Sequence, residues 1–357
     1  MTSVSNLINR KVTKKIRVGD TFIGGDSPIS VQSMTNTDTR DIKATIDQIK
    51  RLEEAGCEIV RAAIVDNEAA EAMGVIKKAI RIPLVADIHF DYRLALTCIS
   101  NGVDKIRLNP GNIGDIDRVK LVVEMAKQKD IPIRIGVNSG SIEKHILQKY
   151  KGVTPEGMVE SALGHAEILE GLDYDQIIFS IKASNVPMTI SAYSIMSEKS
   201  QYPLHVGVTE AGTIYKGTIR SAVGIGCLLA GGVGDTVRVS LTGDPVEEVK
   251  VASEILKSLG LKKHGVEFIS CPTCGRCQID LIAIATQVED KLQHINRDIK
   301  VAVMGCAVNG PGEAKEADIG IAGGKGEVLL FKKGEIIRKI PEESAVEELI
   351  LEIEQLL

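Results

Sequence analysis

Short runs of β-branched residues alternate with amphipathic helical stretches along residues 29–260. The helical stretches, such as residues 45–55 and 119–129, show helical spacing of apolar positions, and several begin at Ser, Thr or Asp and end near Gly. Eight repeats of strand and helix predict a (β/α)8 TIM-type barrel of the α/β class, with a doubly wound open sheet as the alternative. The predicted strands cover residues 29–34, 58–63, 83–88, 105–108, 131–137, 176–181, 204–208 and 236–241.

The chain on either side of this repeat has a different character. Residues 15–25 predict a small hairpin that plugs the N-terminal mouth of the barrel, and the polar residues 260–265, bounded by glycines, predict a linker. We therefore expect a barrel domain over residues 1–260 and a smaller α+β domain over residues 261–357. The second domain is expected to contain a helix over 278–295, a strand over 300–304, a hairpin near 332–335 and a closing helix over 342–357.

Composition narrows the classes of function. Hydrophobic residues make up 44% and charged residues 25% of the chain, which excludes a disordered chain, a coiled coil and a collagen-like repeat. The net charge of −5 and the small number of aromatic rings, 6 Tyr and 5 Phe with no Trp, disfavour nucleic-acid binding. The sequence contains neither a signal peptide nor an apolar run of about 18 residues, so we expect a cytoplasmic protein that does not bind membranes.

Polar residues gather where the predicted strands end, and in a closed parallel barrel these ends form the active-site face. Arginines and a lysine that meet at one mouth repel each other unless an anion lies among them, and guanidinium groups match phosphate oxygens. We therefore expect a diphosphate or a similar polyanion to bind there; the alternative is that the cations pair with carboxylates and only close the barrel. The residues at or just past the strand ends are Arg61, Asp87, His89, Arg107, Asn109, Arg134, Asn138, Lys182, Glu210, Arg238 and Ser240.

Asp87 and Glu210 are the evident acids at strand ends, and each is a candidate for moving a proton. Glu210, in the segment VTEAG beside a turn, is favoured for chemistry, whereas a structural ion pair is weighed equally with chemistry for Asp87. His89 and His205 lie on or next to strands. We expect both histidines to be hydrogen-bonded packing residues and assign neither to a metal.

The strongest local signal is the segment CPTCGRC, which contains Cys271, Cys274 and Cys277 and is followed by Cys306 in MGCAVNGPGE. Two cysteines separated by two residues reach one metal from the same turn, and a third from a distant loop completes the site. Thiolates select zinc or iron–sulfur clusters. A structural zinc site with Cys277 as fourth ligand is one interpretation. A helix expected to start near Arg276 favours the other, a cluster held by three cysteines and one weaker, exchangeable ligand.

The remaining cysteines and one glycine-rich segment are expected to be structural. Cys57, Cys98 and Cys227 have apolar neighbours in the sequence, and we expect them to be buried as small hydrophobes. The segment GIAGGKG at residues 320–326 is only loosely similar to a phosphate-binding loop. A hairpin turn is the favoured interpretation of this segment.

Several segments together resemble the bacterial 4-hydroxy-3-methylbut-2-enyl diphosphate synthase family. The resemblance runs over essentially the whole chain and implies a substrate-binding TIM-type barrel followed by a domain that binds a [4Fe-4S] cluster. The segments that carry it are VQSMTNTDT, VADIHF, IRLNPGNIG, GVTEAG, CPTCGRC and MGCAVNGPGEA.

The resemblance also implies roles for individual residues. It makes Cys271, Cys274, Cys306 and Glu313 the cluster ligands, with the Glu313 carboxylate as the exchangeable one. It makes Glu210 the group that protonates the leaving hydroxyl. The implied substrate-binding residues, which the strand-end argument also selects, are Arg61, Arg107, Arg134, Asn138, Lys182, Arg238 and Ser240.

The reaction implied by the resemblance is the reductive ring opening of 2-C-methyl-D-erythritol 2,4-cyclodiphosphate to (E)-4-hydroxy-3-methylbut-2-enyl diphosphate, in the methylerythritol phosphate pathway of isoprenoid biosynthesis. The implied electron donor is reduced flavodoxin or ferredoxin. The implied assembly is a head-to-tail homodimer, in which the cluster of one chain caps the barrel of the other. Two other classes compete with this one: a zinc-stabilised barrel lyase or isomerase acting on a phosphorylated substrate, and a non-enzymatic cluster carrier.

Overall fold

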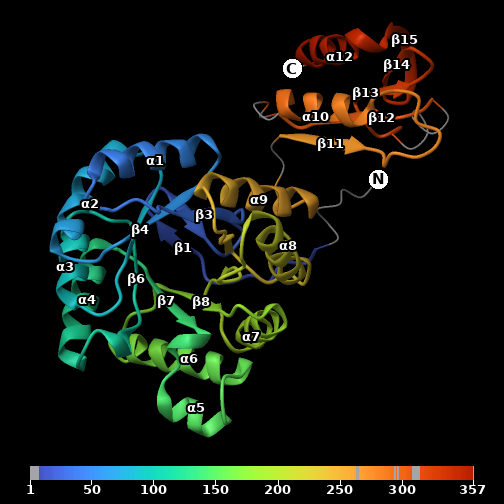
Figure 1. Cartoon of the computed structure of the whole chain (residues 1–357). Coiled ribbons are helices and arrows are strands. Elements are labelled where there is room, and N and C mark those ends of the chain that lie inside the picture. The colour runs from blue at the N-terminus through green and yellow to red at the C-terminus, as the bar shows by residue number, and fades with distance from the viewer. Residues whose placement is uncertain (1–7, 263–264, 293–294, 296, 308–313, 357) are drawn as a thin grey trace. The chain divides into compact units, whose positions relative to one another are not determined.

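The computed structural model describes residues 8–262, 265–292, 295, 297–307 and 314–356. The chain divides into two compact units, Met1–Lys262 and Lys263–Leu357, which are drawn from blue to gold and from orange to red in Figure 1. Within the described ranges, no helix is both long and apolar enough to cross a lipid bilayer.

The first unit is a barrel of parallel strands with helices around its outside (Figure 1). Within residues 8–262, eight strands pair in the order β8-β7-β6-β5-β4-β3-β10-β9. A bridge between Phe179 and Leu204 joins the two ends of this sheet, so the predicted (β/α)8 barrel is confirmed and the open-sheet alternative is wrong. The barrel strands are β3 (Ser30–Met34), β4 (Ile59–Ala63), β5 (Leu84–Asp87), β6 (Lys105–Arg107), β7 (Ile133–Asn138), β8 (Ile177–Lys182), β9 (His205–Val206) and β10 (Thr236–Val237).

The helices around the barrel begin where the sequence supplies a cap. The side chains of Asp66 and Asp115 accept hydrogen bonds from backbone N–H groups one turn later, which fixes the starts of α2 and α4. The helices of this unit are α1 (Ile42–Glu54), α2 (Asn67–Ala79), α3 (Tyr92–Ser100), α4 (Ile116–Lys129), α5 (Lys144–Tyr150), α6 (Pro155–Glu170), α7 (Val186–Lys199), α8 (Ile214–Ala230) and α9 (Pro245–Ser258), with short 3-10 turns η2 (Pro110–Asn112) and η3 (Ser139–Ser141).

A hairpin seals the N-terminal end of the barrel, as predicted. Its strands β1 (Ile16–Val18) and β2 (Thr21–Ile23) are antiparallel. Their apolar side chains form one fully buried cluster with residues from the starts of three barrel strands, so the seal is hydrophobic. The members of this cluster are Ile16, Val18, Ile23, Ile59, Val85 and Ile178.

The second unit contains a mixed sheet. Among its described residues, five strands pair in the order β11-β12-β13-β14-β15, with the first three parallel and the last two antiparallel. Two helices, α10 and α12, pack together with apolar residues from one face of this sheet. The elements are β11 (Val266–Ser270), α10 (Leu281–Leu292), β12 (Ile299–Met304), β13 (Ile319–Gly323), β14 (Glu327–Lys332), β15 (Glu335–Pro341), η4 (Glu342–Ser344) and α12 (Ala345–Glu354).

Most of the predicted elements of this unit are confirmed, including the strand at 300–304, the hairpin near 332–335 and the closing helix. Residues 320–323 belong to β13 and residues 324–326 form its turn to the antiparallel strand β14, so the hairpin interpretation of this segment is confirmed. Strand β11 was not predicted, because it is an edge strand whose partly exposed residues lack a regular apolar alternation. The expectation that Cys227 is buried is wrong, because it lies on the exposed side of α8, whereas Cys57 and Cys98 are buried.

Candidate active site and cysteine loops

Most of the residues predicted at strand ends lie at or just past the C-terminal ends of the barrel strands, but this placement is wrong for Arg61, which is in the middle of β4, and for Arg134, which is the second residue of β7. Strand register brings three of them into one row, because Asp87 lies opposite Arg107 and Arg107 lies opposite Arg134. Asn138 and Lys182 lie opposite each other at the ends of β7 and β8. Arg238 and Ser240 follow β10, and Glu210 follows β9 in an exposed loop with a backbone φ of +52°.

Asp87 is the acidic centre of this row. Its carboxylate lies 3.3 Å from Nη1 of Arg107 and 3.8 Å from Nε of Arg61, and His89 lies 3.6 Å away. Burial alone would raise the pKa of Asp87, but Arg61, His89 and Arg107 outweigh it and hold the pKa well below the ordinary value. Asp87 is therefore an ionised partner of the arginines. The expectation for His89 is wrong in one respect, because its side chain is exposed and contacts Arg107 at 3.3 Å instead of packing in the core.

Two glycines on the inner face of the barrel make room for the cations. A Cβ atom at Gly136 would lie 2.6 Å from Nε of Arg107, and one at Gly207 would lie 2.9 Å from Nζ of Lys182. The Gly136 backbone also orders this side of the mouth. Its carbonyl accepts hydrogen bonds from Nη2 of Arg107 at 2.8 Å and from Nδ2 of Asn109 at 3.0 Å, and its N–H donates to Oδ1 of Asn109 at 2.8 Å.

Several cations of the mouth are buried, but not all of their N–H groups have hydrogen-bond partners among the described residues. Nε and Nη1 of Arg134 have no hydrogen-bond partner among the described residues, although the side chain is 1% exposed. Burial, together with repulsion from Arg61 and Arg107, lowers the pKa of Arg134 below its ordinary value. Burial and repulsion from Arg238 and Arg134 lower the pKa of Lys182 in the same way. Buried cations without partners favour an anionic ligand, which supplies the missing acceptors.

Two charged interior residues, Glu248 and Lys105, were not predicted from the sequence. Glu248, near the start of α9, accepts hydrogen bonds from Oγ of Ser33 and from the N–H of Leu241, both at 3.0 Å. Lys105 is fully buried on β6, with Nζ 3.4 Å from Oε1 of Gln32. Period-two alternation along residues 105–107 could have identified Lys105 as inward-facing, because Arg107 was already selected.

The expectation that His205 is a hydrogen-bonded packing residue is confirmed for its packing and wrong for its hydrogen bonds. It is completely buried on β9, but neither ring nitrogen has a hydrogen-bond partner within the described part of the chain. Burial, together with Arg134 and Lys182, lowers its pKa far below the ordinary value, so the imidazole is neutral. In the described part of the barrel, the buried or half-buried charges of this region are six cations, Arg61, Lys105, Arg107, Arg134, Lys182 and Arg238, and two carboxylates, Asp87 and Glu248.

The predicted cysteine ligands lie in two loops at one edge of the second sheet. Cys271 directly follows β11 and Cys306 follows β12, and these strands are parallel neighbours, with Ser270 opposite Val303. The loops touch, because the N–H of Gly305 donates to Sγ of Cys271 at 3.1 Å. Backbone N–H donors of this kind stabilise thiolate sulfur.

Cys274 and Cys277 lie between these points. The N–H of Cys277 donates to the carbonyl of Cys274 at 2.9 Å, which folds the segment into a turn. The expected helix start near Arg276 is wrong: α10 begins at Leu281, after Asp280 accepts a hydrogen bond from the N–H of Ala283. Cys277 therefore lies in the loop, where its thiol is 3.3 Å from the carbonyl of Ile279. Its exclusion from the ligand set on the ground of a helical position no longer holds.

The cysteines fit a thiophilic metal in donor type and in strand position. Glu313 lies outside the described residues. Within the described ranges, no group of three Cys, His, Asp or Glu side chains is close enough to hold a metal ion. Metal binding and local folding are commonly coupled, and a metal held by both loops would need their thiols to come closer together.

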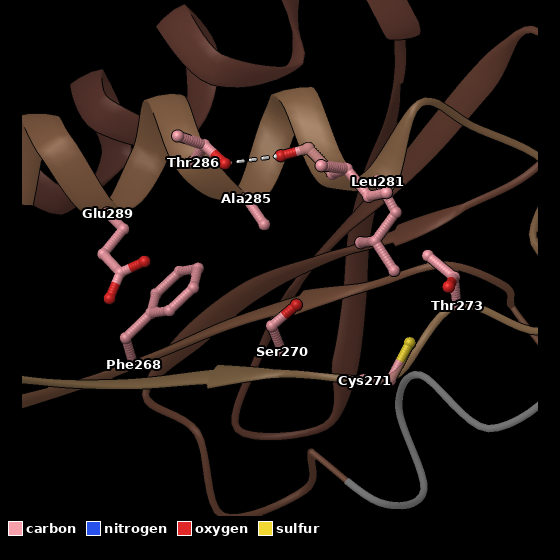
Figure 2. A pocket seen from close by; sticks show the side chains of 9 residues that line it. Phe268, Ser270, Cys271, Thr273, Leu281, Ala285, Thr286 and Glu289 are labelled. Atoms are coloured by element: carbon pink, nitrogen blue, oxygen red, sulfur yellow. Dashed lines mark hydrogen bonds between the residues drawn. The ribbon is translucent and has the colours of Figure 1, made fainter. Parts of the chain in front are cut away.

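A cavity of about 420 Å³ adjoins this edge, between β11 and α10. Figure 2 shows Cys271 and Thr273 at one end of it and Phe268 and Glu289 at the other. The hydroxyl of Thr286 donates to the carbonyl of Ile282 at 2.8 Å and is thereby engaged within the helix. Cys271 thus accepts a hydrogen bond from the neighbouring loop and lines one end of this cavity.

Two solved structures share the barrel fold at low sequence identity. The type I 3-dehydroquinate dehydratase from Clostridium difficile is 15% identical, covers 69% of this chain and 98% of its own, and superposes with a TM-score of 0.52. The dihydropteroate synthase from Stenotrophomonas maltophilia is 12% identical, with coverage of 70% and 97% and a TM-score of 0.50. This similarity concerns the fold alone.

Proteins of much higher identity match the whole chain. Proteins named 4-hydroxy-3-methylbut-2-en-1-yl diphosphate synthase (flavodoxin) from Ruminiclostridium cellulolyticum and Clostridium acetobutylicum are 72% and 63% identical, and they cover 99% and 98% of this chain and 100% of their own. The protein of that name from Geobacter sulfurreducens is 61% identical, with coverage of 97% and 98%. Residues 13–253 match the GcpE TIM-barrel domain and residues 267–355 match the GcpE protein C-terminal domain. Since both domains are present in this order, the chain belongs to the GcpE family.

Proposed function

We propose that this protein catalyses the reductive ring opening of 2-C-methyl-D-erythritol 2,4-cyclodiphosphate to (E)-4-hydroxy-3-methylbut-2-enyl diphosphate. The observation that carries the proposal is the excess of buried cations over carboxylates at the barrel mouth, in a chain with full-length relatives of that name. A cyclic diphosphate has the charge and the oxygen acceptors that these side chains lack. The reaction breaks a C–O bond of the ring, whose oxygen stays on the diphosphate, consumes two electrons and one proton, and releases one hydroxyl group as water.

The mouth residues bind and orient the diphosphate. The arginines donate paired N–H groups to phosphate oxygens, and Lys182 adds a point charge. Asp87 holds two of the arginines in place by ion pairing. The proposed substrate-binding residues are Arg61, Arg107, Arg134, Asn138, Lys182, Arg238 and Ser240.

Glu210 is the proposed proton donor to the leaving hydroxyl group. Its side chain is exposed in a loop at the active-site face, and its φ of +52° lies in a region that non-glycine residues seldom adopt. Loops at this face carry the catalytic residues of TIM-type barrels. The exposed position also gives Glu210 access to protons from solvent before the substrate binds.

The proposed cofactor is a [4Fe-4S] cluster held by Cys271, Cys274, Cys306 and Glu313. When bound, such a cluster supplies electrons singly and keeps one weakly held iron position. The chain contributes the thiolates and the Gly305 N–H group that donates to Cys271. The proposed electron donor is reduced flavodoxin, which the names of the relatives include, or ferredoxin.

The proposed assembly is a head-to-tail homodimer in the cytoplasm, in which the cluster domain of one chain caps the barrel of the other. A cap excludes water from the reduced substrate and admits the next substrate when it opens. Mixing the Cys306→Ser variant with the Arg134→Met variant, so that mixed dimers form, tests this arrangement. Activity recovered in the mixture supports sites shared between chains, and the absence of any recovery contradicts them.

The central test is anaerobic purification followed by metal analysis and turnover of the cyclodiphosphate with dithionite and a viologen dye. Brown protein with about four iron and four sulfide per chain that releases the linear diphosphate supports the proposal. A colourless protein with one zinc supports the lyase or isomerase alternative. A brown protein without turnover supports a cluster carrier and overturns the proposed activity.

A further inference from the structure

A histidine outside the barrel joins two of its active-site loops. His165 lies on α6 and is 4% exposed. Its Nδ1 accepts a hydrogen bond from the N–H of Gly111, at 3.2 Å, and its Nε2 lies 3.1 Å from Oε1 of Glu143. Gly111 belongs to η2 in the loop after β6, and Glu143 directly precedes α5 in the loop after β7. One imidazole therefore bridges two consecutive loops at the C-terminal face.

Both loops begin at or next to residues of the proposed substrate site, Arg107 before the first loop and Asn138 at the start of the second. The first loop begins with Asn109, whose side-chain amide exchanges two hydrogen bonds with Gly136 on β7. The second loop begins with Asn138, whose N–H donates a hydrogen bond to Oγ of Ser141 at 3.0 Å. His165 thus completes a closed set of contacts that runs from β6 through both loops and back to β7.

We propose that His165 is a positioning residue, which holds the loops after β6 and β7 together through a neutral imidazole protonated on Nε2. Only this form accepts from Gly111 and donates to Glu143 at the same time. The role in substrate binding rests on the proposed function, because the loops that His165 joins begin next to Arg107 and at Asn138, which are proposed to bind the substrate. The tie between the loops does not rest on it.

Several charged and titratable groups line the cavity of about 470 Å³ beside His165. Burial lowers the pKa of His165, and the Glu143 carboxylate acts in the opposite direction. Glu160 is already engaged by Lys149 at 2.6 Å and by the hydroxyl of Tyr150 at 2.8 Å. The remaining groups that face the cavity are Glu156 and Glu167 from α6, His145 from α5 and Lys199 from α7.

The hydrogen bond between Gly111 and His165 can also be broken by a substitution at Gly111. A Cβ atom at this position would lie 2.8 Å from Cε1 of His165. The glycine does not have a positive φ, so alanine is compatible with its backbone and the obstacle is the imidazole itself. Gly111→Ala should therefore separate the loop from His165 without altering α6.

Hydrogen–deuterium exchange of the loaded protein tests the tie directly. His165→Ala and Gly111→Ala should each raise exchange in residues 109–114 roughly fivefold, the scale of one lost hydrogen bond. The double variant should exchange like either single variant, because both remove the same contact. Gly164→Ala is the matched control on α6, since its Cβ meets nothing within 4 Å. Additive effects, or equal effects in the control, overturn the proposal.

The pH dependence of this exchange separates a positioning role from simple packing. Protonation of His165 turns Nδ1 into a donor, so protection of residues 109–114, corrected for intrinsic exchange, should fall as the pH drops below the ordinary histidine pKa. Glu143→Gln removes the carboxylate that favours the charged ring and should shift this fall to lower pH. His165→Ala should show no such step. A step that is unchanged in Glu143→Gln overturns the assignment.

Kinetics then connects the tie to the substrate. His165→Ala should raise the KM for the cyclodiphosphate roughly fivefold and change kcat by less than about twofold. If exchange rises while KM stays at the wild-type value, the tie exists but the positioning role is overturned. If the wild-type protein does not turn over the cyclodiphosphate, the proposed function fails, and the exchange data still decide whether the tie exists.

Discussion

Arg238 and Glu248 form an ion pair at the barrel mouth, with Nη2 of the arginine 3.5 Å from Oε1 of the glutamate. The arginine follows β10 and the glutamate comes from the first turn of α9, so the pair connects the inner wall of the barrel to its outer layer. Burial, with repulsion from Arg61, lowers the pKa of Arg238 to about 10, and Glu248 opposes this change. Glu248 also accepts hydrogen bonds from Ser33 and Leu241. One carboxylate therefore compensates a buried cation and two neutral donors.

Glu248→Gln should lower the free energy of unfolding of the barrel by about 1–3 kcal/mol. The substitution removes the charge beside Arg238 and replaces one acceptor by an NH2 group that faces donors. Thermal unfolding followed by circular dichroism measures the effect. Glu254→Gln on the same helix is the matched control, because Glu254 is exposed and its replacement should change stability by less than about 0.5 kcal/mol. Equal stability of the Glu248→Gln variant and the control would contradict the structural weight given to this pair.

The contribution of Asp87 to stability should depend on pH in a defined direction. Its pKa in the folded protein lies below the unfolded value of about 3.9, so the carboxylate stabilises the fold fully above roughly pH 5. This contribution is lost as the pH falls toward the folded pKa. The stability difference between wild type and Asp87→Asn should be constant from about pH 6 to 8 and shrink below about pH 4. Urea unfolding at each pH measures it, and a difference that grows on acidification would contradict the ion-pair assignment.

Sequence periodicity predicts the strand-end site because the barrel repeats one unit. Once residues 105–108 and 131–137 are assigned to strands, parallel pairing places Arg107 and Arg134 on neighbouring strands, and the register puts them opposite each other. The prediction that Arg134 lies at a strand end is wrong, because it is the second residue of β7. The same rule selects Lys182 and Asn138 without knowledge of any contact between them. This rule therefore predicts the end of the barrel at which residues such as Asn138 and Lys182 lie.

Strand periodicity does not predict the residues that contact the barrel mouth or its loops from the surrounding helices. Glu248 and His165 are ordinary members of amphipathic helices in the sequence, and the loop that each contacts depends on the rotation of its helix against the barrel. Cys277 was misplaced for a local reason. The cap at Asp280 starts α10 four residues later than Cys277, and propensity alone does not distinguish the two possible starts.

Substitutions at two neighbouring cysteines should separate the three-cysteine cluster from a four-thiolate zinc site. Cys306→Ser should remove the visible absorption of the loaded protein and abolish turnover, while the circular dichroism of the barrel stays unchanged. Cys277→Ser should keep about four iron per chain, since its thiol is engaged by the Ile279 carbonyl and not required by the proposed ligand set. Each variant differs from the wild type by one sulfur atom, and the two substituted residues lie in loops that touch. Each variant therefore serves as the control for the other. Loss of metal in Cys277→Ser would favour the four-thiolate site.

Arg134 should show opposite effects on stability and on binding. Its guanidinium is buried with two nitrogens lacking partners among the described residues, so the ligand-free protein bears the cost of an uncompensated charge. Arg134→Met keeps most of the volume and removes that charge, and it should raise the free energy of unfolding by roughly 1–3 kcal/mol. The same change removes donors from the proposed diphosphate site and should weaken binding of the cyclodiphosphate at least tenfold. Thermal unfolding without substrate and calorimetric titration with it measure the two effects. Replacing a residue that only supports the fold lowers the stability of the protein. Replacing a residue that is retained for its ligand raises the stability of the ligand-free protein and lowers its affinity for the ligand. A destabilised Arg134→Met variant with wild-type affinity would therefore make Arg134 a structural residue.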